Sequence, residues 1–471
     1  MRHALDCGSV VLTLALALGA CDAGSSSEPA NIGGDTGSAA GGSESAGTTA
    51  GAGTTTGAGG APIGSAGMGA AGTTASAGTG SGTGAGAGGM SSGAAGAGTG
   101  IVMNDPATYT QNSAGAKYPY PQGHAFPHCA FPAYNTDKVA LAYRNWKTKF
   151  FQGGRVIRPE NGNDTVSEGV AYGMLIGVYM NDKPMFDALW TYAQGKRDGN
   201  GLMNWHLDEN GGTVSGGAAT DADEDMAYAL LMAGAQWNGE YHASAVTLIN
   251  AIWDKEVEGG SIVLKPGDNF GGSSQTNPSY FAPSYYRAFA KATPGHNWAA
   301  VIESSYTILA AAAGAQGLVP NWVNAQGAGV NGPGNDVNGL YYGYDACRTP
   351  FRIALDFCET GEPRAKAYLD KVVGFLDKAG GPRLAALKDG YTTSGANPPG
   401  TLGDYGAGMA FFGPAGVAAL SGGHDAVMSG VYSSLVVNTT NAASTSFTYF
   451  HGSWGVLSLL ALSGNYWDMT L

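Results

Sequence analysis

Residues 219–231 read Ala-Thr-Asp-Ala-Asp-Glu-Asp-Met-Ala-Tyr-Ala-Leu-Leu, a segment in which four acids within five positions lead directly into an apolar stretch. Apolar residues recur at helical spacing along it and beyond it, at Met226, Leu230, Ala233 and Trp237. The segment therefore predicts a helix over residues 220–237 with one face in a core. Either Thr220 or Asp221 is expected to cap this helix, because both side chains accept hydrogen bonds from the first helical N–H groups.

The acids at the start of this helix have two readings. In the first, they are functional carboxylates held in place at the N-terminus of a helix that packs in the core. In the second, they are solvated residues at the start of a well-capped helix. A calcium loop is disfavoured. Asp221, Asp223 and Asp225 alternate as such a loop requires, but Met226 and Met232 stand where it needs Gly and Glu.

Charge and composition limit the partners of the chain. It has 471 residues, of which only 13% are charged, and a formal net charge of −13. A nucleic-acid groove is disfavoured because it needs a positive field, and acidic or sulfated substrates are disfavoured for the same reason. A neutral or cationic substrate fits this charge better.

The N-terminus has the pattern of an export signal. A weakly positive start precedes the apolar run 10–18, which is too short to span a bilayer as a helix. The following Leu-Gly-Ala-Cys at 18–21 is similar to a lipoprotein cleavage box, so residues 1–21 are predicted to be a signal peptide with Cys21 as the lipidated residue. Plain secretion with cleavage nearby is the alternative.

The next segment, residues 22–100, is nearly all Gly, Ala, Ser and Thr, and is predicted to be a flexible tether. Residues 101–471 are expected to form one folded domain. Three cysteines fall within it, so at most one internal disulfide forms and one thiol stays free. The default expectation for Cys129, Cys347 and Cys358 is that of small buried hydrophobic residues.

About a dozen amphipathic or apolar stretches of similar length occur in this domain, separated by loops rich in Gly, Asn and Pro. A ring or barrel of helical hairpins is the economical architecture for so many helices in one domain. The predicted helices span 136–150, 167–180, 184–193, 220–237, 242–253, 283–291, 298–314, 350–357, 363–378, 401–419, 426–437 and 452–464.

The predicted helix boundaries place several aromatic residues on the loops. Exposed aromatic rings suit stacking against the apolar faces of sugars, although about half of them would simply pack loops onto the barrel. The residues concerned are Trp205, Phe270, Tyr280, Tyr341, Tyr342, Tyr344, Tyr449 and Phe450.

Glu168 lies in the first turn of the helix predicted over 167–180, which Ser167 can cap. Its functional reading is a general acid, and its alternative is an ordinary residue of a helix start. A helix N-terminus lowers the pKa of a carboxyl group, whereas a general acid at neutral pH needs a raised pKa. Burial, or a second carboxylate such as Asp221, would have to outweigh the helix dipole.

Asp345 lies among three tyrosines in a loop that precedes a helix start, with Thr349 as the expected cap and Pro350 at the first helical position. Held by Arg348 and by phenol hydroxyls, an ionised Asp345 would remain a base at pH 7. The alternative is an Asp–Arg ion pair that fixes the loop.

Other chemistries find less support in the sequence. The histidines are scattered without metal-ligand spacing, so no metal and no cofactor are expected, and no Gly-x-Ser-x-Gly elbow occurs in a strand–turn–helix setting. Two or three carboxylates with aromatic loops indicate glycoside hydrolysis, in which one carboxyl protonates the leaving oxygen and another activates water or attacks.

Seven motifs, in order along residues 118–471, closely resemble glycoside hydrolase family 8, and within it the bacterial endo-β-1,4-glucanases. They are Thr165-Val166-Ser167-Glu168-Gly169, Gly201-Leu202-Met203-Asn204-Trp205, the 219–237 segment, Leu264-Lys265-Pro266-Gly267-Asp268, Gly271-Gly272-Ser273-Ser274, Asn277-Pro278-Ser279-Tyr280-Phe281-Ala282-Pro283 and Tyr344-Asp345-Ala346-Cys347-Arg348. The resemblance implies an all-α (α/α)6 barrel with an open substrate cleft at one end, and hydrolysis of internal β-1,4-glucan bonds with inversion.

The resemblance also implies roles for single residues. Glu168 matches the general acid, Asp345 the general base, and Asp221 the acid that binds and helps to distort the sugar at the cleavage point. The other matches are positioning or substrate-binding residues: Tyr344, Arg348, Trp205 and Tyr280. Phe270 stands where the cellulases have Trp, which is expected to weaken stacking at one subsite, and the aromatic pattern near Tyr449 and Phe450 also differs.

The expected partner is a polysaccharide, and a monomer is expected. The same chemistry on xylan or chitosan is an alternative, since the family spans all three substrates. A non-catalytic surface lipoprotein that captures polysaccharide is the alternative from another class of protein.

Overall fold

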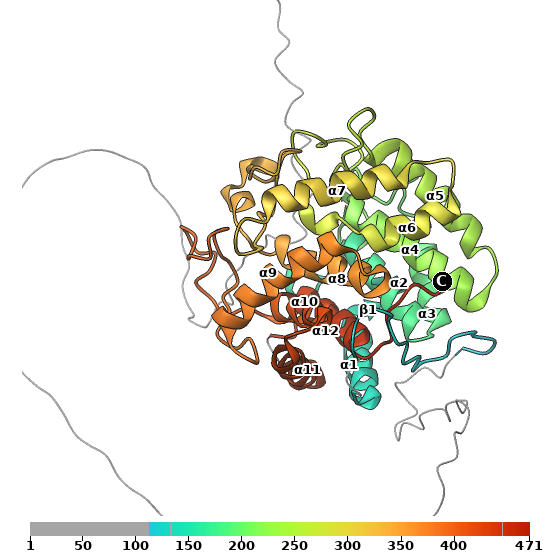
Figure 1. The fold of residues 1–471 in the computed structure, drawn as a ribbon. Coiled ribbons are helices and arrows are strands. Elements are labelled where there is room, and N and C mark those ends of the chain that lie inside the picture. The colour runs from blue at the N-terminus through green and yellow to red at the C-terminus, as the bar shows by residue number, and fades with distance from the viewer. Residues whose placement is uncertain (1–112, 132–133, 445) are drawn as a thin grey trace, which may run out of the picture. The chain divides into compact units, whose positions relative to one another are not determined.

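The structure is a computed structural model that describes residues 113–131, 134–444 and 446–471. The predicted signal peptide, Cys21 and the predicted tether lie outside the described residues. The described part contains twelve α-helices (Figure 1). These are α1 (Thr136–Phe150), α2 (Ser167–Tyr179), α3 (Lys183–Gln194), α4 (Thr220–Trp237), α5 (Tyr241–Glu256), α6 (Pro283–Ala292), α7 (Trp298–Ala312), α8 (Thr349–Thr360), α9 (Pro363–Gly380), α10 (Met409–Ala418), α11 (Asp425–Thr440) and α12 (Tyr449–Leu462).

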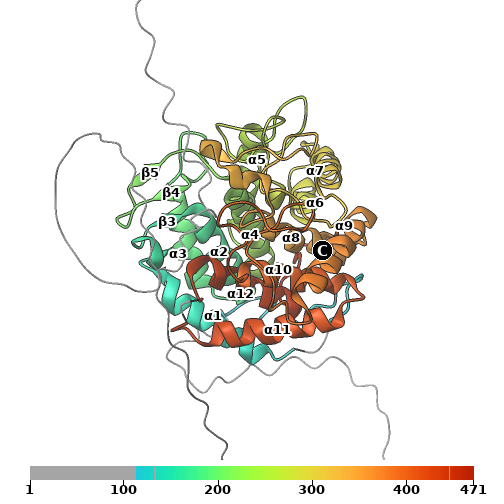
Figure 2. The same ribbon diagram turned by 90° about the vertical axis from the view of Figure 1, so that its left-hand side faces the viewer.

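The even-numbered helices form a closed inner ring. Each contacts the next in the order α2, α4, α6, α8, α10, α12, and α12 contacts α2. The odd-numbered helices form the outer layer: α3, α5, α7, α9 and α11 each pack on the inner helix that precedes them in the chain, and α1 packs on α11 and α12 (Figure 2). The fold is therefore an (α/α)6 barrel, and the predicted all-α fold class is confirmed.

The composition of the two layers explains their places. Every residue of α2 and of α10 is buried, which a helix surrounded on all sides requires. The outer helix α1 buries only one face, which includes Tyr143 and Trp146. Glycines let the layers approach closely: a Cβ added at Gly173 of α2 would lie 2.7 Å from Leu189 Cδ1 of α3. The apolar and small residues of the inner helices thus make the core of the barrel.

Two small antiparallel sheets accompany the helices in the described chain. The first pairs β1 (Phe151–Gln152) with β2 (Arg155–Val156). The second has the order β3 (Thr165–Val166), β4 (His206–Leu207), β5 (Thr213–Ser215), with an irregular register at His206 and Leu207. Strand β3 leads directly into α2, so this sheet fixes where the first inner helix begins.

Short 3-10 helices complete the connections: η1 (Pro159–Asn161), η2 (Pro278–Tyr280), η3 (Pro333–Asn335), η4 (Val337–Leu340), η5 (Ala346–Arg348) and η6 (Ala419–Ser421). The starts of several inner helices meet at one end of the barrel, because Glu168 of α2, Asp221 of α4 and Tyr449 of α12 all lie in one hydrogen-bonded cluster with Arg348, which precedes α8. Helix N-termini carry partial positive charge, so this end suits carboxylates.

Several local predictions were wrong. The helix predicted over 401–419 begins only at Met409, and the part before it is a loop that includes Gly403 at a φ of +88°. Within the described residues, no side chain caps α2, α4 or α8, whose N-cap residues are Val166, Ala219 and Arg348. The expected capping residues Ser167, Thr220 and Thr349 are instead the first helical residues.

The three cysteines of the folded domain form one disulfide and leave one thiol free, within the expected limit of at most one disulfide, but the default expectation of small buried hydrophobic residues is wrong for the bonded pair. Cys129 is bonded to Cys358, 229 residues away, which ties the segment before α1 to α8. Cys347 is free and buried, as expected of a small hydrophobic residue. Among the described helices, none combines the length and the apolar character that crossing a membrane needs.

Candidate active site

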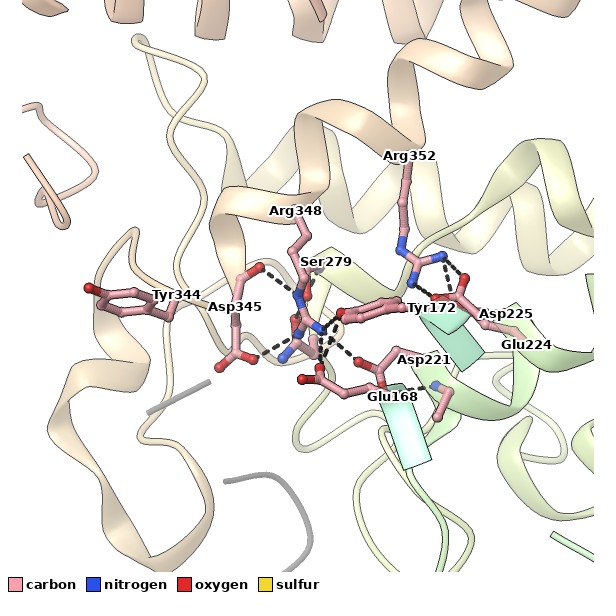
Figure 3. Close-up of polar contacts among 12 residues, drawn as sticks. Glu168, Tyr172, Asp221, Glu224, Asp225, Ser279, Tyr344, Asp345, Arg348 and Arg352 are labelled. Atoms are coloured by element: carbon pink, nitrogen blue, oxygen red, sulfur yellow. Dashed lines mark hydrogen bonds and ion pairs between the residues drawn. The ribbon is translucent and has the colours of Figure 1, made fainter. Parts of the chain in front are cut away.

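The site is organised around the guanidinium group of Arg348, which is buried at the end of η5 (Figure 3). Its Nη1 lies 2.6 Å from Asp221 Oδ2 and 3.2 Å from Glu168 Oε2, and its Nη2 lies 2.9 Å from Asp345 Oδ1. The three predicted catalytic residues are therefore brought together by one cation. Arginine suits this position because its planar fork presents donors in several directions and stays charged when buried.

Glu168 stands in the first turn of α2, fully buried. Besides Arg348, two hydroxyls donate to it: Tyr449 to Oε1 at 2.9 Å and Tyr172 to Oε2 at 3.1 Å. Burial raises the pKa of Glu168 to about 8; the charge of Asp221 adds to the rise, and the Arg348 guanidinium opposes it. The raised pKa of this carboxyl group is what a general acid needs near neutral pH.

Asp221 and the three acids that follow it on α4 are all buried, so the interpretation of this segment as a helix start with solvated acids is wrong. Asp221 Oδ1 accepts a hydrogen bond from the N–H of Ala222 at 2.9 Å, while Oδ2 is bound to Arg348. The residue expected to cap the helix is instead committed to a tertiary ion pair.

Asp345 lies just before η5 and is 6% exposed. Its Oδ2 accepts from the indole N–H of Trp322 at 3.1 Å. Asn321 fixes the surrounding loop, since its Oδ1 accepts from the N–H groups of Gly343 and Ala346 at 3.0 and 2.8 Å. Burial raises the pKa of Asp345 to about 6, against the charge of Arg348. Asp345 is therefore ionised, and able to accept a proton, above this pH.

The expected support of Asp345 by tyrosine hydroxyls is wrong for Tyr344. The Tyr344 ring points away from Arg348 in Figure 3, and its hydroxyl donates to Asp389 Oδ2 at 3.3 Å. Trp322 holds Asp345 instead, a residue that the sequence analysis missed, and nothing in its local sequence signals the contact. Tyr172 was also missed, although its position four residues after Glu168 on one helix could have indicated it.

The two candidate proton-transfer groups lie close together. The terminal nitrogens of one guanidinium are about 2.3 Å apart, so contacts of 3.2 and 2.9 Å place Glu168 Oε2 and Asp345 Oδ1 within about 8.5 Å of each other. Both carboxyl groups can therefore address one bond of a bound substrate.

The predicted sugar-stacking aromatics divide into two groups. Trp205 and Tyr280 are only 3% and 1% exposed, contrary to their expected exposure on loops, and Tyr280 packs with its ring centre 5.3 Å from the Arg348 guanidinium carbon. Phe270 and Tyr344 remain partly exposed. Tyr342 and Tyr449 are buried as well, and Tyr341 and Phe450 are partly exposed.

Metal ligation has no evident place in the described chain: no group of three or more His, Cys, Asp or Glu residues there is arranged to hold an ion. The indole N–H of Trp205 is buried and finds no hydrogen-bond acceptor among the described residues.

Acid–base cleavage of a glycosidic bond needs two carboxyl groups within reach of that bond, and the fold and the site together define a glycoside hydrolase. Its barrel of helical hairpins and the order of its motifs narrow the choice of glycoside hydrolase family. The chain belongs to glycosyl hydrolases family 8, whose family model matches residues 119–463.

Characterised relatives support this membership. Endoglucanase 2 of Ruminiclostridium josui is 36% identical over 381 residues, which cover 75% of this chain and 78% of the relative. Endoglucanase A of Acetivibrio thermocellus is 37% identical over 349 residues, 70% of each chain. A solved structure, the β-1,3-1,4-glucanase from Paenibacillus sp. X4, superposes with a TM-score of 0.67 at 29% identity and covers 74% of this chain and 99% of its own.

Proposed function

We propose that this glycoside hydrolase is an endo-acting β-1,4-glucanase that cleaves cellulose or related β-glucans with inversion. The observation that carries the proposal is the pairing of Glu168 and Asp345 on one guanidinium, with a pKa of about 8 for the first and about 6 for the second. Between these values the pair holds one proton in the arrangement that acid–base cleavage uses. The glucanase names of the relatives support the substrate.

In the proposed mechanism, Glu168 protonates the leaving glycosidic oxygen while Asp345 takes a proton from the attacking water. Asp221 binds the sugar at the cleavage point and favours its distortion. Arg348 keeps the three carboxyl groups at fixed positions, and Trp322 with Arg348 positions the base.

Substrate binding is proposed to involve three further aromatic residues, Trp205, Tyr280 and Phe270. Phe270 is partly exposed and offers a ring face for stacking.

We further propose that the enzyme is an exported monomer, made with the signal peptide 1–21, anchored through lipid on Cys21 and held off the membrane by residues 22–100. Support comes from the sequence pattern. Mass spectrometry of the mature N-terminus tests this: a diacylglyceryl group on Cys21 is expected, and an unmodified N-terminus at another position would overturn the anchor.

Proton NMR of the products from a defined cello-oligosaccharide tests substrate and stereochemistry together. The α-anomer is expected as the first product. Initial formation of the β-anomer would exclude inversion. Parallel assays on cellulose, mixed-linkage β-glucan, xylan and chitosan are expected to give the highest rate on a glucan. Binding without any product would instead favour a polysaccharide-capturing protein.

A further inference from the structure

A second ion pair lies one helical turn below the Arg348 cluster. Arg352, in α8, lies four residues after Arg348. Asp225 lies four residues after Asp221 on α4. Residues four apart lie on the same helix face, so the N-cap and the first turns of α8 present two guanidinium groups to two carboxylates of α4. Helix α6 lies between α4 and α8 in the inner ring. Both contacts therefore join inner helices that are not neighbours in the ring.

The geometry of this lower pair is bidentate. Arg352 Nη1 lies 2.8 Å from Asp225 Oδ1, and Nη2 lies 3.1 Å from Oδ2, with both side chains only 2% exposed. Glu224 Oε1 is 3.4 Å from Arg352 Nη1, and its Oε2 accepts from the hydroxyl of Tyr286 at 3.0 Å. Burial raises the pKa of Glu224 well above its ordinary value, and the charge of Arg352 opposes the rise. Asp225, which makes both contacts of the bidentate pair, is the main counter-charge of Arg352.

One side chain, that of Tyr172, lies between the Arg348 cluster and the Asp225–Arg352 pair. The hydroxyl of Tyr172 is 3.1 Å from Glu168 Oε2 and 3.3 Å from Arg348 Nη1, and its ring lies between the two guanidinium groups in Figure 3. A change of charge in the lower pair therefore acts on the upper cluster through buried surroundings, where charges are weakly screened.

Charged and titratable groups surround both the Arg348 cluster and the Asp225–Arg352 pair. Glu168 and Asp345 are faced by Arg348, Asp221, Tyr172, Tyr449, Arg158 and Cys347. The lower pair is faced by Glu224, Asp221, Arg348, Tyr172, Tyr285 and Tyr466.

We propose that Asp225 and Arg352 are positioning residues for the hydrolytic reaction: they hold α4 and α8 in register, so that Asp221 meets Arg348, and their balanced charges set the electrostatic field at Glu168 and Asp345. Neither residue touches the reacting atoms in this proposal. It rests on the proposed function, because Glu168 and Asp345 are taken as the acid and the base.

Removing one member of the pair leaves the other buried and unbalanced. Asp225→Asn leaves the positive charge of Arg352, which favours the ionised forms of Glu168 and Asp345. Arg352→Gln leaves the negative charge of Asp225, which favours their protonated forms. The two substitutions are therefore expected to shift the pKa values of Glu168 and Asp345 in opposite directions. A loss of packing alone would not produce opposite shifts.

The experiment measures kcat/KM against pH for the full chain on a soluble β-glucan. Asp225→Asn is expected to move both limbs of the profile to lower pH by about 0.5–1 unit, and Arg352→Gln to move them to higher pH by a similar amount. The double variant Asp225→Asn/Arg352→Gln is expected to return the limbs to their wild-type positions. Arg352→Lys, which keeps the charge, is expected to keep the limbs and lower only kcat.

A matched control lies one turn further along α8. Asp356 forms a bidentate pair with Arg287 of α6, at 2.7 and 3.1 Å, that does not reach α4. Asp356→Asn and Arg287→Gln are expected to lower the thermal unfolding midpoint while leaving both limbs in place. Equal movement of the limbs in these controls would overturn the inference, because a change of charge in a pair that does not reach α4 would then have the same effect.

The outcomes separate the inference from the function. If wild-type protein cleaves glucan and the limbs of the single variants stay fixed or move together, the positioning role is wrong and the enzyme assignment stands. If wild-type protein cleaves no polysaccharide, the proposed function fails. Carbon-13 NMR titration of the Glu168 carboxyl, assigned with Glu168→Gln, then still tests the field of the pair: opposite shifts in Asp225→Asn and Arg352→Gln support it, and equal shifts overturn it.

Discussion

The hydroxyl of Tyr449 lies 2.9 Å from Glu168 Oε1, although the two residues are 281 positions apart in the chain. The contact joins the start of α12 to the start of α2, where the inner ring closes. The same tyrosine fills the space beside Gly169, where an added Cβ would lie 2.9 Å from the tyrosine ring. Tyr449 thus fixes both the position and the hydrogen bonding of the proposed general acid.

Tyr449→Phe tests the electrostatic part of this contact. The hydroxyl donates to the carboxylate and so lowers the pKa of Glu168, although burial keeps that pKa raised. Its removal is expected to move the alkaline limb of kcat/KM to higher pH by about 0.5–1 unit. The acidic limb, assigned to Asp345, is expected to stay in place. Movement of the alkaline limb to lower pH would contradict the assignment.

Replacing the two proposed catalytic carboxyls should abolish turnover without abolishing binding. Glu168→Gln and Asp345→Asn are each expected to lower kcat by about 10²–10⁴-fold, because each removes one proton transfer. Cello-oligosaccharide affinity, measured by calorimetry, is expected to change little. Glu209→Gln, at an exposed residue, is the control. Near-wild-type turnover in Glu168→Gln would exclude this residue as the acid.

The wild-type enzyme should have a bell-shaped pH profile. Activity is expected to rise as Asp345 ionises near pH 6 and to fall as Glu168 loses its proton near pH 8, since burial raises both pKa values. The measurement is kcat/KM from pH 4 to pH 10 at constant ionic strength. A profile with a single acidic limb, flat to pH 10, would show that Glu168 does not supply the proton.

Stability should depend on pH through a residue far from the site. Glu359 is partly buried, accepts hydrogen bonds from Ser284 Oγ at 2.6 Å and Asp468 N at 3.1 Å, and has a pKa raised by desolvation to about 8. A carboxyl with a raised folded-state pKa contributes stability below its unfolded-state pKa, and this contribution is lost as pH rises to the folded value. Wild-type stability is therefore expected to fall between about pH 5 and 8.

Glu359→Gln isolates that contribution. A glutamine can accept from Asp468 N and donate to Ser284 Oγ without carrying a charge. The variant is expected to show a smaller loss of unfolding free energy between pH 5 and pH 8 in urea denaturation. Glu303→Gln, at a side chain that is 67% exposed, is the matched control and should follow the wild type. Parallel curves for all three proteins would rule out the titration of Glu359.

The Cys129–Cys358 bond should stabilise the folded chain. It closes a loop with a sequence separation of 229 residues. Its removal by the double substitution to serine is expected to lower the unfolding free energy by about 2–5 kcal/mol. Denaturation of wild-type protein with and without a reductant checks this, and Cys347→Ala should respond to the reductant as the wild type does. Identical midpoints in both conditions would contradict the prediction.

Hydrophobic periodicity predicted a ring or barrel of helical hairpins, and the family resemblance implied its (α/α)6 form. The helix predicted over 220–237 matches α4, and that over 136–150 matches α1, because long periodic segments override uncertainty at single positions. The 401–419 prediction failed at its start because residues 401–408 share the small and apolar composition of α10. Their placement depends on tertiary contacts such as the bridge between Lys388 and Gly406.

The contacts within the site were harder to predict than the residues that form it. The caps were assigned from local rules, but Asp221 bonds to Arg348 across the barrel, and a charge-assisted tertiary contact outweighs a local cap. Trp322 and Tyr449 reach the site from loops and helices more than a hundred residues from Glu168, at distances that only the folded ring defines. Sequence spacing has no information on such contacts.

The ring that α12 closes also sets an order of events during synthesis. Because α2 is made early and its partner α12 is made last, the ribosome releases almost the whole catalytic domain before Glu168 can meet Tyr449. A nascent chain that lacks α12 exposes the apolar flanks of α2 and α10 to solvent or to chaperones. The contact between Glu168 and Tyr449 can therefore form only after α12, the last helix of the inner ring, has been made.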